Sequence, residues 1–171
     1  MSEIFKEIKP EFIKENPIDL IGSKWMLITS GKLSSFNTMT ASWGAIGFLW
    51  NKPVAFCFVR PERYTYKFME ENTFFSLSFF SEKYRQALNI CGTTSGKNFD
   101  KIKATKLTPI EGITKTVIFK EAIIVMELRK IYFTDIDKNN ILEYDVLKNY
   151  ETSGFHRMYI GEILYCGIRE K

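Results

Sequence analysis

Two short segments of the sequence combine residue types that suit a flat, phosphorylated ring. The first mixes amide and hydroxyl side chains with a tryptophan, in the order Asn37-Thr38-Met39-Thr40-Ala41-Ser42-Trp43-Gly44-Ala45. The second is a cation-rich turn, Arg60-Pro61-Glu62-Arg63-Tyr64-Thr65-Tyr66. Hydroxyl and backbone groups can hydrogen-bond the edge of a heteroaromatic ring, an indole offers an apolar face, and guanidinium groups bind phosphate bidentately. Together the two segments predict a binding site for such a ring.

The first segment alternates as a strand does, and we expect a strand over residues 38–43. Its two faces are Thr38, Thr40 and Ser42 on one side and Met39, Ala41 and Trp43 on the other. Hydroxyl side chains are also common on exposed strand faces, so a purely structural role stays open at this point.

The second segment predicts the start of a helix. Pro61 suits the first turn of a helix that continues to Met69. Proline lacks a backbone N–H, and the N–H groups of the first turn have no acceptor within the helix. Residues 63–65 would then lie in the first turn, where free N–H groups and the positive end of the helix dipole attract an anion. The alternative for Arg60 and Arg63 is solvation or pairing with nearby carboxylates.

Length and composition are those of one globular domain, which we place at residues 1–171. Hydrophobic residues make up 45% and charged residues 26%, which excludes disordered and collagen-like classes. The net charge is +4 and the lysines are scattered, so we expect no nucleic-acid binding and favour small phosphate-bearing molecules. The 15 Phe, 8 Tyr and 3 Trp can line a ring-binding pocket or an oligomer interface as well as a core.

The N-terminus has no basic region followed by an apolar run, and no apolar segment approaches about 18 residues. We therefore expect a cytoplasmic protein that does not bind membranes.

Few residues offer chemistry of their own. The three cysteines, Cys57, Cys91 and Cys166, lie far apart without a C-x-x-C pair, and we expect buried thiols. The single histidine, His156, leaves one candidate base for a hydrolase, and no cluster of ligands favours a metal site. An enzymatic function would therefore depend on an organic cofactor that the protein binds and orients.

Short apolar runs rich in β-branched and aromatic residues predict a mainly β fold. The expected strands are 25–30, 38–43, 54–59, 74–79, 122–133 and 159–167, of which the fifth should be the longest. Beside the helix near Pro61, we expect helices over 83–90, ended by Gly92, and over 98–103. The polar cluster 135–140 predicts a turn that links strands or borders an exposed edge.

Four motifs resemble one family, the flavin reductase-like, FMN-binding split-barrel proteins that include flavoredoxin. They are N-T-M-T-A-S-W-G from Asn37 with the following W-x-x-P, R-P-x-R-Y-T-Y from Arg60, S-G-K-x-x-D-K from Ser95, and H-x-x-x-x-G-x-I from His156. The resemblance extends from about residue 25 to 167. It implies a six-stranded antiparallel Greek-key split β-barrel with a few peripheral helices, which forms a homodimer with FMN near the interface.

The resemblance also implies roles for particular residues. The ring and ribityl chain of FMN would lie along Asn37, Thr38, Met39, Thr40, Ser42 and Trp43, and its phosphate beside Arg60, Arg63, Tyr64 and Thr65. The segment Ser95, Gly96 and Lys97 would pack near the flavin at a subunit interface, with close backbone approach at Gly96 and a cation at Lys97; a plain connecting loop is the alternative. His156 would lie near the nicotinamide or the flavin, or would only steady a turn.

Three functions remain open from the sequence. The first is an FMN-binding oxidoreductase that reduces flavin or ferric iron with NADH or NADPH. The second is a flavoredoxin-type electron carrier that serves a redox protein partner and has no nicotinamide site. The third is a ligand-binding barrel without a redox role, because fold similarity alone does not assign function.

Overall fold

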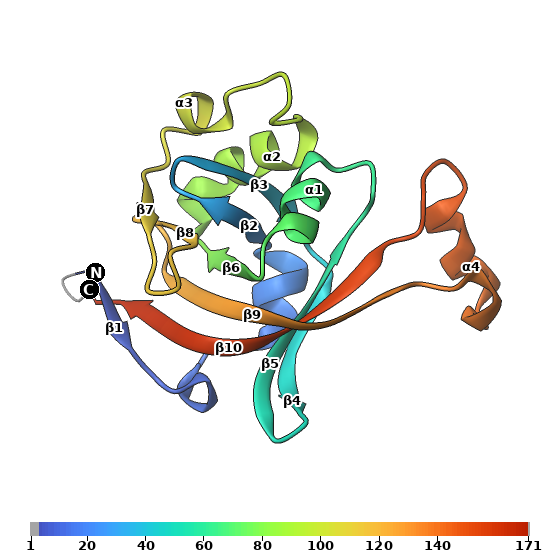
Figure 1. The fold of residues 1–171 in the computed structure, drawn as a ribbon, viewed down its shortest axis with the longest axis horizontal. Coiled ribbons are helices and arrows are strands. Elements are labelled where there is room, and N and C mark those ends of the chain that lie inside the picture. The colour runs from blue at the N-terminus through green and yellow to red at the C-terminus, as the bar shows by residue number, and fades with distance from the viewer. Residues whose placement is uncertain (1–3, 171) are drawn as a thin grey trace.

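The computed structural model of the protein describes residues 4–170, which form one large antiparallel sheet that curls around a core (Figure 1). The strands of this sheet are β1 (Phe5–Glu7), β2 (Met26–Lys32), β3 (Ser35–Ala41), β4 (Gly44–Leu49), β5 (Lys52–Val59), β6 (Phe74–Phe79), β9 (Ile124–Asp135) and β10 (Arg157–Arg169). They pair in the order β3-β2-β6-β9-β10-β5-β4, and β1 adds to β10. A separate hairpin joins β7 (Pro109–Glu111) to β8 (Val117–Phe119).

The barrel is split between β3 and β4, the two ends of the sheet. These strands are consecutive in the chain, and Ser42 and Trp43 connect them at a corner. Within the described residues β3 and β4 are not hydrogen-bonded neighbours, so the sheet closes without a ladder at this seam. The predicted mainly β antiparallel split barrel is confirmed, with β1 and β4 in addition to the six predicted strands.

The core has two parts because several strands are buried on both faces. On β2, Met26 and Ile28 face the inside of the barrel, whereas Leu27 packs under α2 with Phe80 and Leu88. Burial on both faces explains why this strand is a continuous apolar run and not an alternating one. All three cysteines are buried and unpaired, as predicted.

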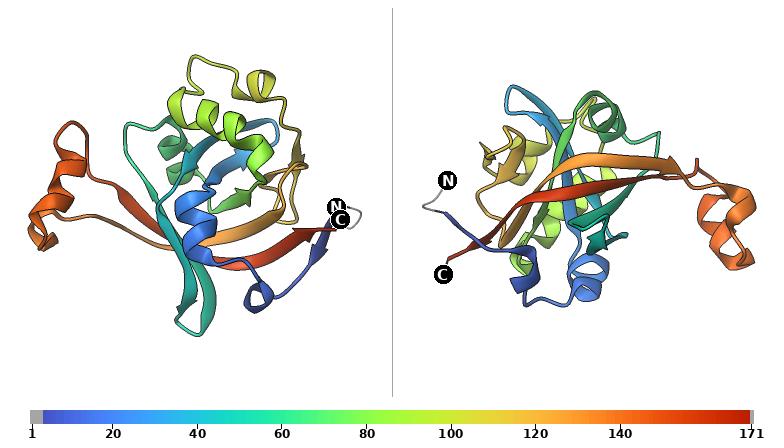
Figure 2. Two further views of the ribbon diagram at one scale, coloured as in Figure 1. Left: turned by 180° about the vertical axis from the view of Figure 1, so that it is seen from behind. Right: turned by 60° about the horizontal axis from the view of Figure 1, so that its bottom comes forward.

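Three helices cover the β2 and β3 side of the barrel (Figures 1 and 2). They are α1 (Tyr64–Glu71), α2 (Arg85–Thr93) and α3 (Lys101–Thr105), and the short α4 (Tyr144–Leu147) lies apart from them. Single turns of 3-10 helix occur at Pro10–Phe12, Glu82–Tyr84, Lys138–Asn140 and Lys148–Tyr150, with a π-helical turn at Asp19–Ser23. Within the described residues no helix is long and apolar enough to cross a membrane.

Several predicted boundaries were wrong. The strand predicted at 38–43 spans 35–41, because its last two residues form the corner at the seam. Gly92 does not end α2, which runs to Thr93; a Cβ at Gly92 would lie 3.3 Å from the Thr40 Cβ, so glycine lets the helix approach β3. The third helix begins at Lys101, capped by the Asp100 carboxylate, which accepts from the Lys103 N–H at 3.0 Å. The longest strand is β10 with 13 residues, one more than β9.

Residues 136–156 form an arm between β9 and β10 that projects from the barrel and carries α4 (Figures 1 and 2). The predicted turn cluster at 135–140 begins this arm and links the two strands, as expected. The arm contributes no residue to the buried core, and its Leu142 and Tyr144 side chains are exposed. The end of the arm returns to the barrel at His156, immediately before β10.

Candidate functional site

Three adjoining cavities follow the edge strand β3 and form one groove, the β3 groove. The tryptophan cavity, about 240 Å³, lies at the seam between residues 39–43, Phe58, Arg60, Arg63 and His156. The helix cavity, about 170 Å³, lies at the start of α1 between Asn37, residues 62–65, residues 92–95 and Lys101. The loop cavity, about 420 Å³, lies between residues 36–38 and residues 96–102. Every residue that the sequence singled out for the site borders one of these cavities.

The tryptophan cavity joins residues that are far apart in the chain. β5 and β10 pair with Val59 opposite Arg157, so the next residues outward, Arg60 and His156, lie side by side. The Arg60 Nε–H donates to His156 Nε2 at 3.2 Å. The Trp43 ring lies 4.9 Å from the His156 ring between centroids, at an angle of 46°. The seam thus provides an aromatic wall beside a cation.

His156 is held in its neutral form. Because Nε2 accepts from Arg60, the proton of the neutral imidazole is on Nδ1, which is buried and has no hydrogen-bond partner among the described residues. Burial, and then the positive charge of Arg60, lower the pKa of His156 from 6.5 to about 4; Glu62 opposes this shift and Arg63 adds to it. At neutral pH His156 is therefore an uncharged ring with one N–H to offer, and not an imidazolium acid.

Arg60 also holds the arm to the barrel. Its Nη2 donates to the Asn149 carbonyl at 2.8 Å, and its guanidinium lies 5.7 Å from the Tyr150 ring centroid. Beside it, the Gly154 N–H donates to the Glu62 carboxylate at 2.5 Å. The turn before α1 is therefore attached to the arm on one side and faces the groove on the other.

The helix cavity lies at the start of α1. The helix begins at Tyr64, three residues later than Pro61, with Arg63 as an extended N-cap residue whose N–H donates to the Arg60 carbonyl at 3.0 Å. The Tyr66 N–H donates to the Arg63 carbonyl at 2.8 Å, which leaves the amides of Tyr64 and Thr65 without a helical acceptor. These two N–H groups, together with the positive end of the helix dipole, favour an anion here.

Lys101 is the buried cation of the groove, with a relative exposure of 5%. Its ammonium donates to the Thr38 carbonyl at 2.7 Å and to the Cys91 carbonyl at 2.9 Å. Burial lowers the pKa of Lys101 to about 8. Within residues 4–170 neither Lys101 nor Arg63 forms a salt bridge, and burial also lowers the pKa of Arg63. Lys101 is buried and Arg63 is half-buried, with its Nη2 donating to the Cys91 carbonyl at 3.4 Å. In the described part of the chain both side chains are bonded to carbonyls and not to a carboxylate, so this part of the groove attracts an anion.

Asn37 and Gly96 lock β3 to the surrounding loops. The Asn37 side-chain N–H donates to Thr65 Oγ1 at 2.7 Å, so the strand is fixed to the start of α1. A Cβ at Gly96 would lie only 1.9 Å from Asn37 Oδ1. The backbone at Gly96 therefore approaches the Asn37 amide closely, and its approach to a flavin stays a prediction.

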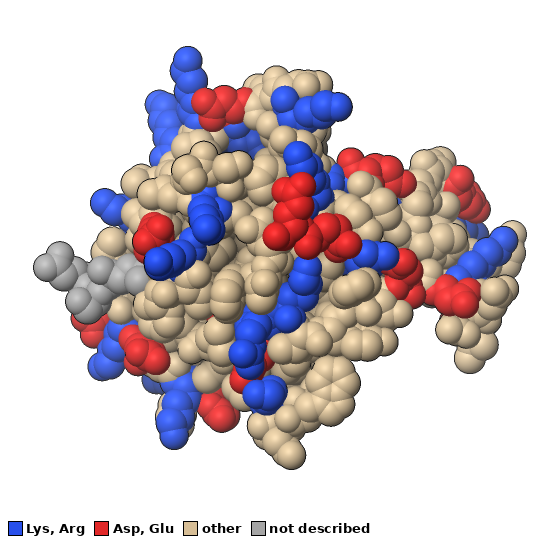
Figure 3. Space-filling view, in the orientation of Figure 1, with Lys and Arg blue, Asp and Glu red and all other residues tan. Residues whose placement is uncertain are grey.

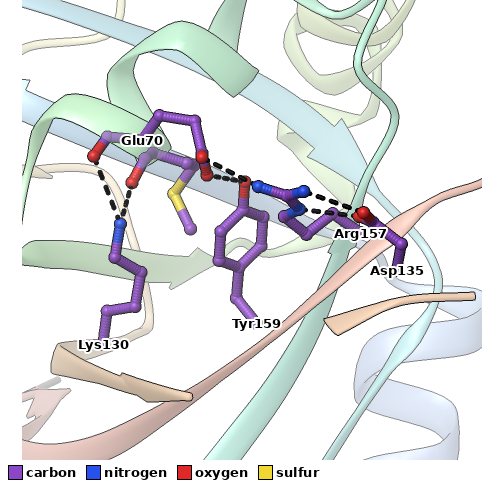
Figure 4. Close-up of polar contacts among 6 residues, drawn as sticks. Glu70, Lys130, Asp135, Arg157 and Tyr159 are labelled. Atoms are coloured by element: carbon purple, nitrogen blue, oxygen red, sulfur yellow. Dashed lines mark hydrogen bonds and ion pairs between the residues drawn. The ribbon is translucent and has the colours of Figure 1, made fainter. Parts of the chain in front are cut away.

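A polar cluster anchors the other end of α1 to the barrel (Figure 4). The Lys130 ammonium donates to the last carbonyls of the helix, including that of Glu70 at 3.4 Å, where a positive charge complements the helix dipole. The Tyr159 hydroxyl donates to the Glu70 carboxylate at 2.6 Å, and Arg157 bridges Glu70 and Asp135 at 2.8 and 2.7 Å. The end of α1 and the start of β10 are thus held together by one polar cluster.

Sequence reasoning missed Lys101, Phe58 and Tyr150. Lys101 ends the S-G-K-x-x-D-K segment, but its charge alone does not distinguish it from the other 23 lysines and arginines. The available signal was its position after Asp100, a good helix cap, which predicts that Lys101 begins a short helix. The contact of its side chain with β3 is a tertiary feature that this signal does not give. Phe58 and Tyr150 flank His156 only because β5 and the arm meet there.

The model of the flavin reductase like domain matches residues 19–171. The chain belongs to this family. Flavoredoxin of Desulfovibrio vulgaris (Miyazaki F) has a TM-score of 0.68 at 23% identity, over 95% of this chain and 78% of its own. Flavoredoxin from Methanosarcina acetivorans has a TM-score of 0.68 at 21% identity, over 96% and 75%. The NADH:FAD oxidoreductase of Streptomyces globisporus C-1027 has a TM-score of 0.65 at 13% identity, over 86% and 78%.

These comparisons confirm the family that the motifs predicted, and they confirm the fold. Because these identities are below 25%, the three solved structures support the split-barrel fold and nothing further. The ligand and the activity must be inferred from the groove of this chain. No curated protein matches the chain.

Proposed function

We propose that the protein binds FMN in the β3 groove and acts as an NAD(P)H-dependent flavin or ferric reductase. The observation that carries the proposal is that Arg63 and Lys101, which form no salt bridge among residues 4–170, border a cavity at the first amides of α1, those of Tyr64 and Thr65. A phosphate would satisfy all four groups, since charge-assisted hydrogen bonds to phosphate are among the stronger ones in proteins.

The ring of FMN would occupy the tryptophan cavity, one step along the groove from its phosphate. Arg63 borders both cavities, so one cofactor can reach from the aromatic wall at Trp43 to the start of α1. The polar groups of Thr40 and Ser42 line this path and can bond the ring edge and the ribityl chain. When bound, FMN supplies the hydride-accepting and electron-transfer chemistry. The residues of the chain bind it, orient it and exclude water from one face.

Within this proposal His156 has a positioning role beside the ring. Its low pKa keeps it uncharged at neutral pH, so it adds no positive charge to the cavity and can pack against an aromatic ligand. Trp43 is 41% exposed, which leaves the cavity open on one side for a nicotinamide or a second ring. His156 and Trp43 together would select for a flat reductant.

We also propose that the protein is a homodimer in which the partner covers this open side. Exposed aromatic side chains at Phe48, Trp50 and Phe133, together with the projecting arm, provide apolar surface that a single chain leaves uncovered. An obligate pair commonly buries on the order of 2,000 Å² or more. Light scattering should give the mass of a dimer, and a monomer with full FMN occupancy at micromolar concentration would contradict this assembly.

Binding is tested by fluorescence titration with FMN and with riboflavin, which differ only in the phosphate. FMN should bind at least about tenfold more tightly, the effect of one good charge-assisted contact of about 1.4 kcal/mol. Equal affinities would show that the helix cavity is not a phosphate site.

Turnover is tested by anaerobic rapid mixing of the FMN-loaded protein with NADH and with NADPH. Fast loss of the oxidised flavin absorbance with either donor supports the reductase. Reduction by neither donor, with FMN tightly bound, would support an electron carrier that depends on a redox protein partner.

A further inference from the structure

Arg60 borders the tryptophan cavity, and the proposed phosphate site does not use it. The family resemblance predicts Arg60 and Arg63 side by side at the phosphate. In the part of the chain that the structure describes, Arg63 borders both the helix and the tryptophan cavities, whereas Arg60 borders the tryptophan cavity alone. Arg60 therefore shares its surroundings with Trp43 and His156 and not with the first amides of α1.

We propose that Arg60 raises the reduction potential of the bound flavin by holding a positive charge beside its ring. This inference rests on the proposed flavin site. Reduction by a nicotinamide transfers one hydride, that is, two electrons and one proton, so the donor becomes its oxidised cation and the neutral ring gains one negative charge. A neighbouring cation stabilises that negative charge and has no such effect on the oxidised ring. Reduced FMN should therefore bind more tightly than oxidised FMN.

The position of the Arg60 charge is fixed by neutral partners. Its Nε–H donates to His156 Nε2 at 3.2 Å, its Nη2 donates to the Asn149 carbonyl at 2.8 Å, and the Tyr150 ring packs against the guanidinium. A guanidinium has five N–H groups, so three remain for a ligand beyond these two contacts within the described residues. Arg60 is also half-buried, and salt screens such a charge less than an exposed one.

The charge of Arg60 is not neutralised by an ion pair. Figure 3 shows acidic and basic side chains together on the surface where the arm leaves the barrel. At this base Arg157 forms ion pairs with Glu70 and Asp135 at 2.8 and 2.7 Å. Arg60 forms no salt bridge among residues 4–170.

Glu62 is the carboxylate that acts against Arg60. Backbone hydrogen bonds, one of them from Gly154, and more weakly the charge of Arg60 lower the pKa of Glu62, so it is ionised at neutral pH. Its negative charge offsets part of the field of Arg60 in the cavity. Removal of either charge should therefore shift the reduction potential, in opposite directions.

Midpoint potentials of the FMN-loaded full chain, measured at pH 7.5 by anaerobic titration with dithionite and a reference dye, test the inference. Arg60→Gln should lower the affinity for reduced FMN relative to oxidised FMN by about tenfold, the lower end of the effect of a charge at about 4 to 6 Å on an ionisation. For a two-electron couple this ratio corresponds to about 30 mV. Arg60→Lys, which keeps the charge, should retain most of the wild-type potential. Glu62→Gln, whose amide oxygen can still accept from the Gly154 N–H, should raise the potential.

The matched control is Lys67→Gln, which removes an exposed cation on α1 that pairs with Glu71 and lies outside the three cavities. It should leave the potential unchanged. An Arg60→Gln variant with bound FMN and the wild-type potential would overturn the inference and leave the flavin site standing. Arg60→Lys and Arg60→Gln with equally lowered potentials would do the same, because the charge would then not be the cause.

Titrations of the same variants with oxidised FMN and with riboflavin separate the ring from the phosphate. Arg60→Gln should change both affinities by the same factor. A loss confined to FMN would make Arg60 a phosphate ligand and overturn the inference. Failure of the wild-type protein to bind FMN would overturn the proposed function together with it.

Discussion

The lowered pKa of Lys101 predicts that the affinity for FMN depends on pH in the range just above neutrality. The phosphate of FMN would bind the protonated amine, and burial places the pKa of Lys101 at about 8. The protonated fraction of such a group falls by about tenfold between pH 7 and pH 9. If the neutral amine contributes nothing to phosphate binding, the Kd for FMN rises by up to about tenfold over the same range.

Fluorescence titrations at half-unit steps from pH 7 to pH 9.5 measure this dependence. Riboflavin is the internal control, because it shares the ring and lacks the phosphate, and its Kd should stay constant. Lys101→Arg should bind FMN with little pH dependence in this range, because a guanidinium stays charged. Lys101→Met should bind FMN weakly and also without pH dependence.

The reasoning is refuted if wild-type FMN affinity stays constant to pH 9.5 while the protein remains folded. It is equally refuted if riboflavin affinity falls in parallel with FMN affinity, since the titrating group would then act on the ring. A Lys101→Met variant that retains the wild-type pH dependence would assign the effect to another group.

Three further predictions concern single residues of the groove. Arg63→Ala should weaken FMN binding by roughly tenfold to a hundredfold and leave the rate of flavin reduction at saturating FMN near wild type, as stopped-flow with preloaded protein can show; unchanged affinity would make Arg63 a surface cation. The imidazole NMR signal of His156 should titrate near pH 4, and Arg60→Gln should raise this pKa without restoring 6.5, because burial remains. Between pH 4 and pH 6.5 the unfolded chain binds more protons at His156 than the folded chain does. The free energy of unfolding should therefore fall as the pH falls from 6.5 toward 4. Gly96→Ala should displace Asn37, lower the stability by about 1 to 3 kcal/mol in chemical denaturation and weaken FMN binding, whereas Gly47→Ala, with open space at its Cβ, should do neither.

The strands that the sequence predicts well are those whose burial is uniform along their length. β6 was predicted with the boundaries it has, because its apolar run lies between a polar turn and a serine-led helix start. β4 was not predicted because Gly44 and Gly47 interrupt its apolar residues, which therefore neither alternate with polar residues nor form a continuous run. Its Phe48 side chain is exposed, so this strand also lacks the burial of its neighbours. The seam at Ser42 and Trp43 depends on which strands pair, and no local pattern records that.

The site residues divide in the same way. Thr40 and Arg63 were predicted because each lies within a short motif with a local chemical meaning. The contact of Arg60 with His156 spans 96 residues and follows only from the register of β5 against β10. The burial of Lys101 follows from the packing of α3 on α2 beside β3, and this burial also lowers its pKa. Long-range pairing and burial are tertiary properties, so the motifs could predict residues that border the groove but not the electrostatics of those residues.

A crystal structure of the FMN-loaded protein tests the central claim most directly, through the position of the phosphorus atom. We predict phosphate oxygens at about 3 Å from the Thr65 amide and within reach of the Arg63 guanidinium and the Lys101 ammonium, with the ring against Trp43. A phosphate bound outside the helix cavity, with Arg63 and Lys101 making no contact to it, would contradict the account.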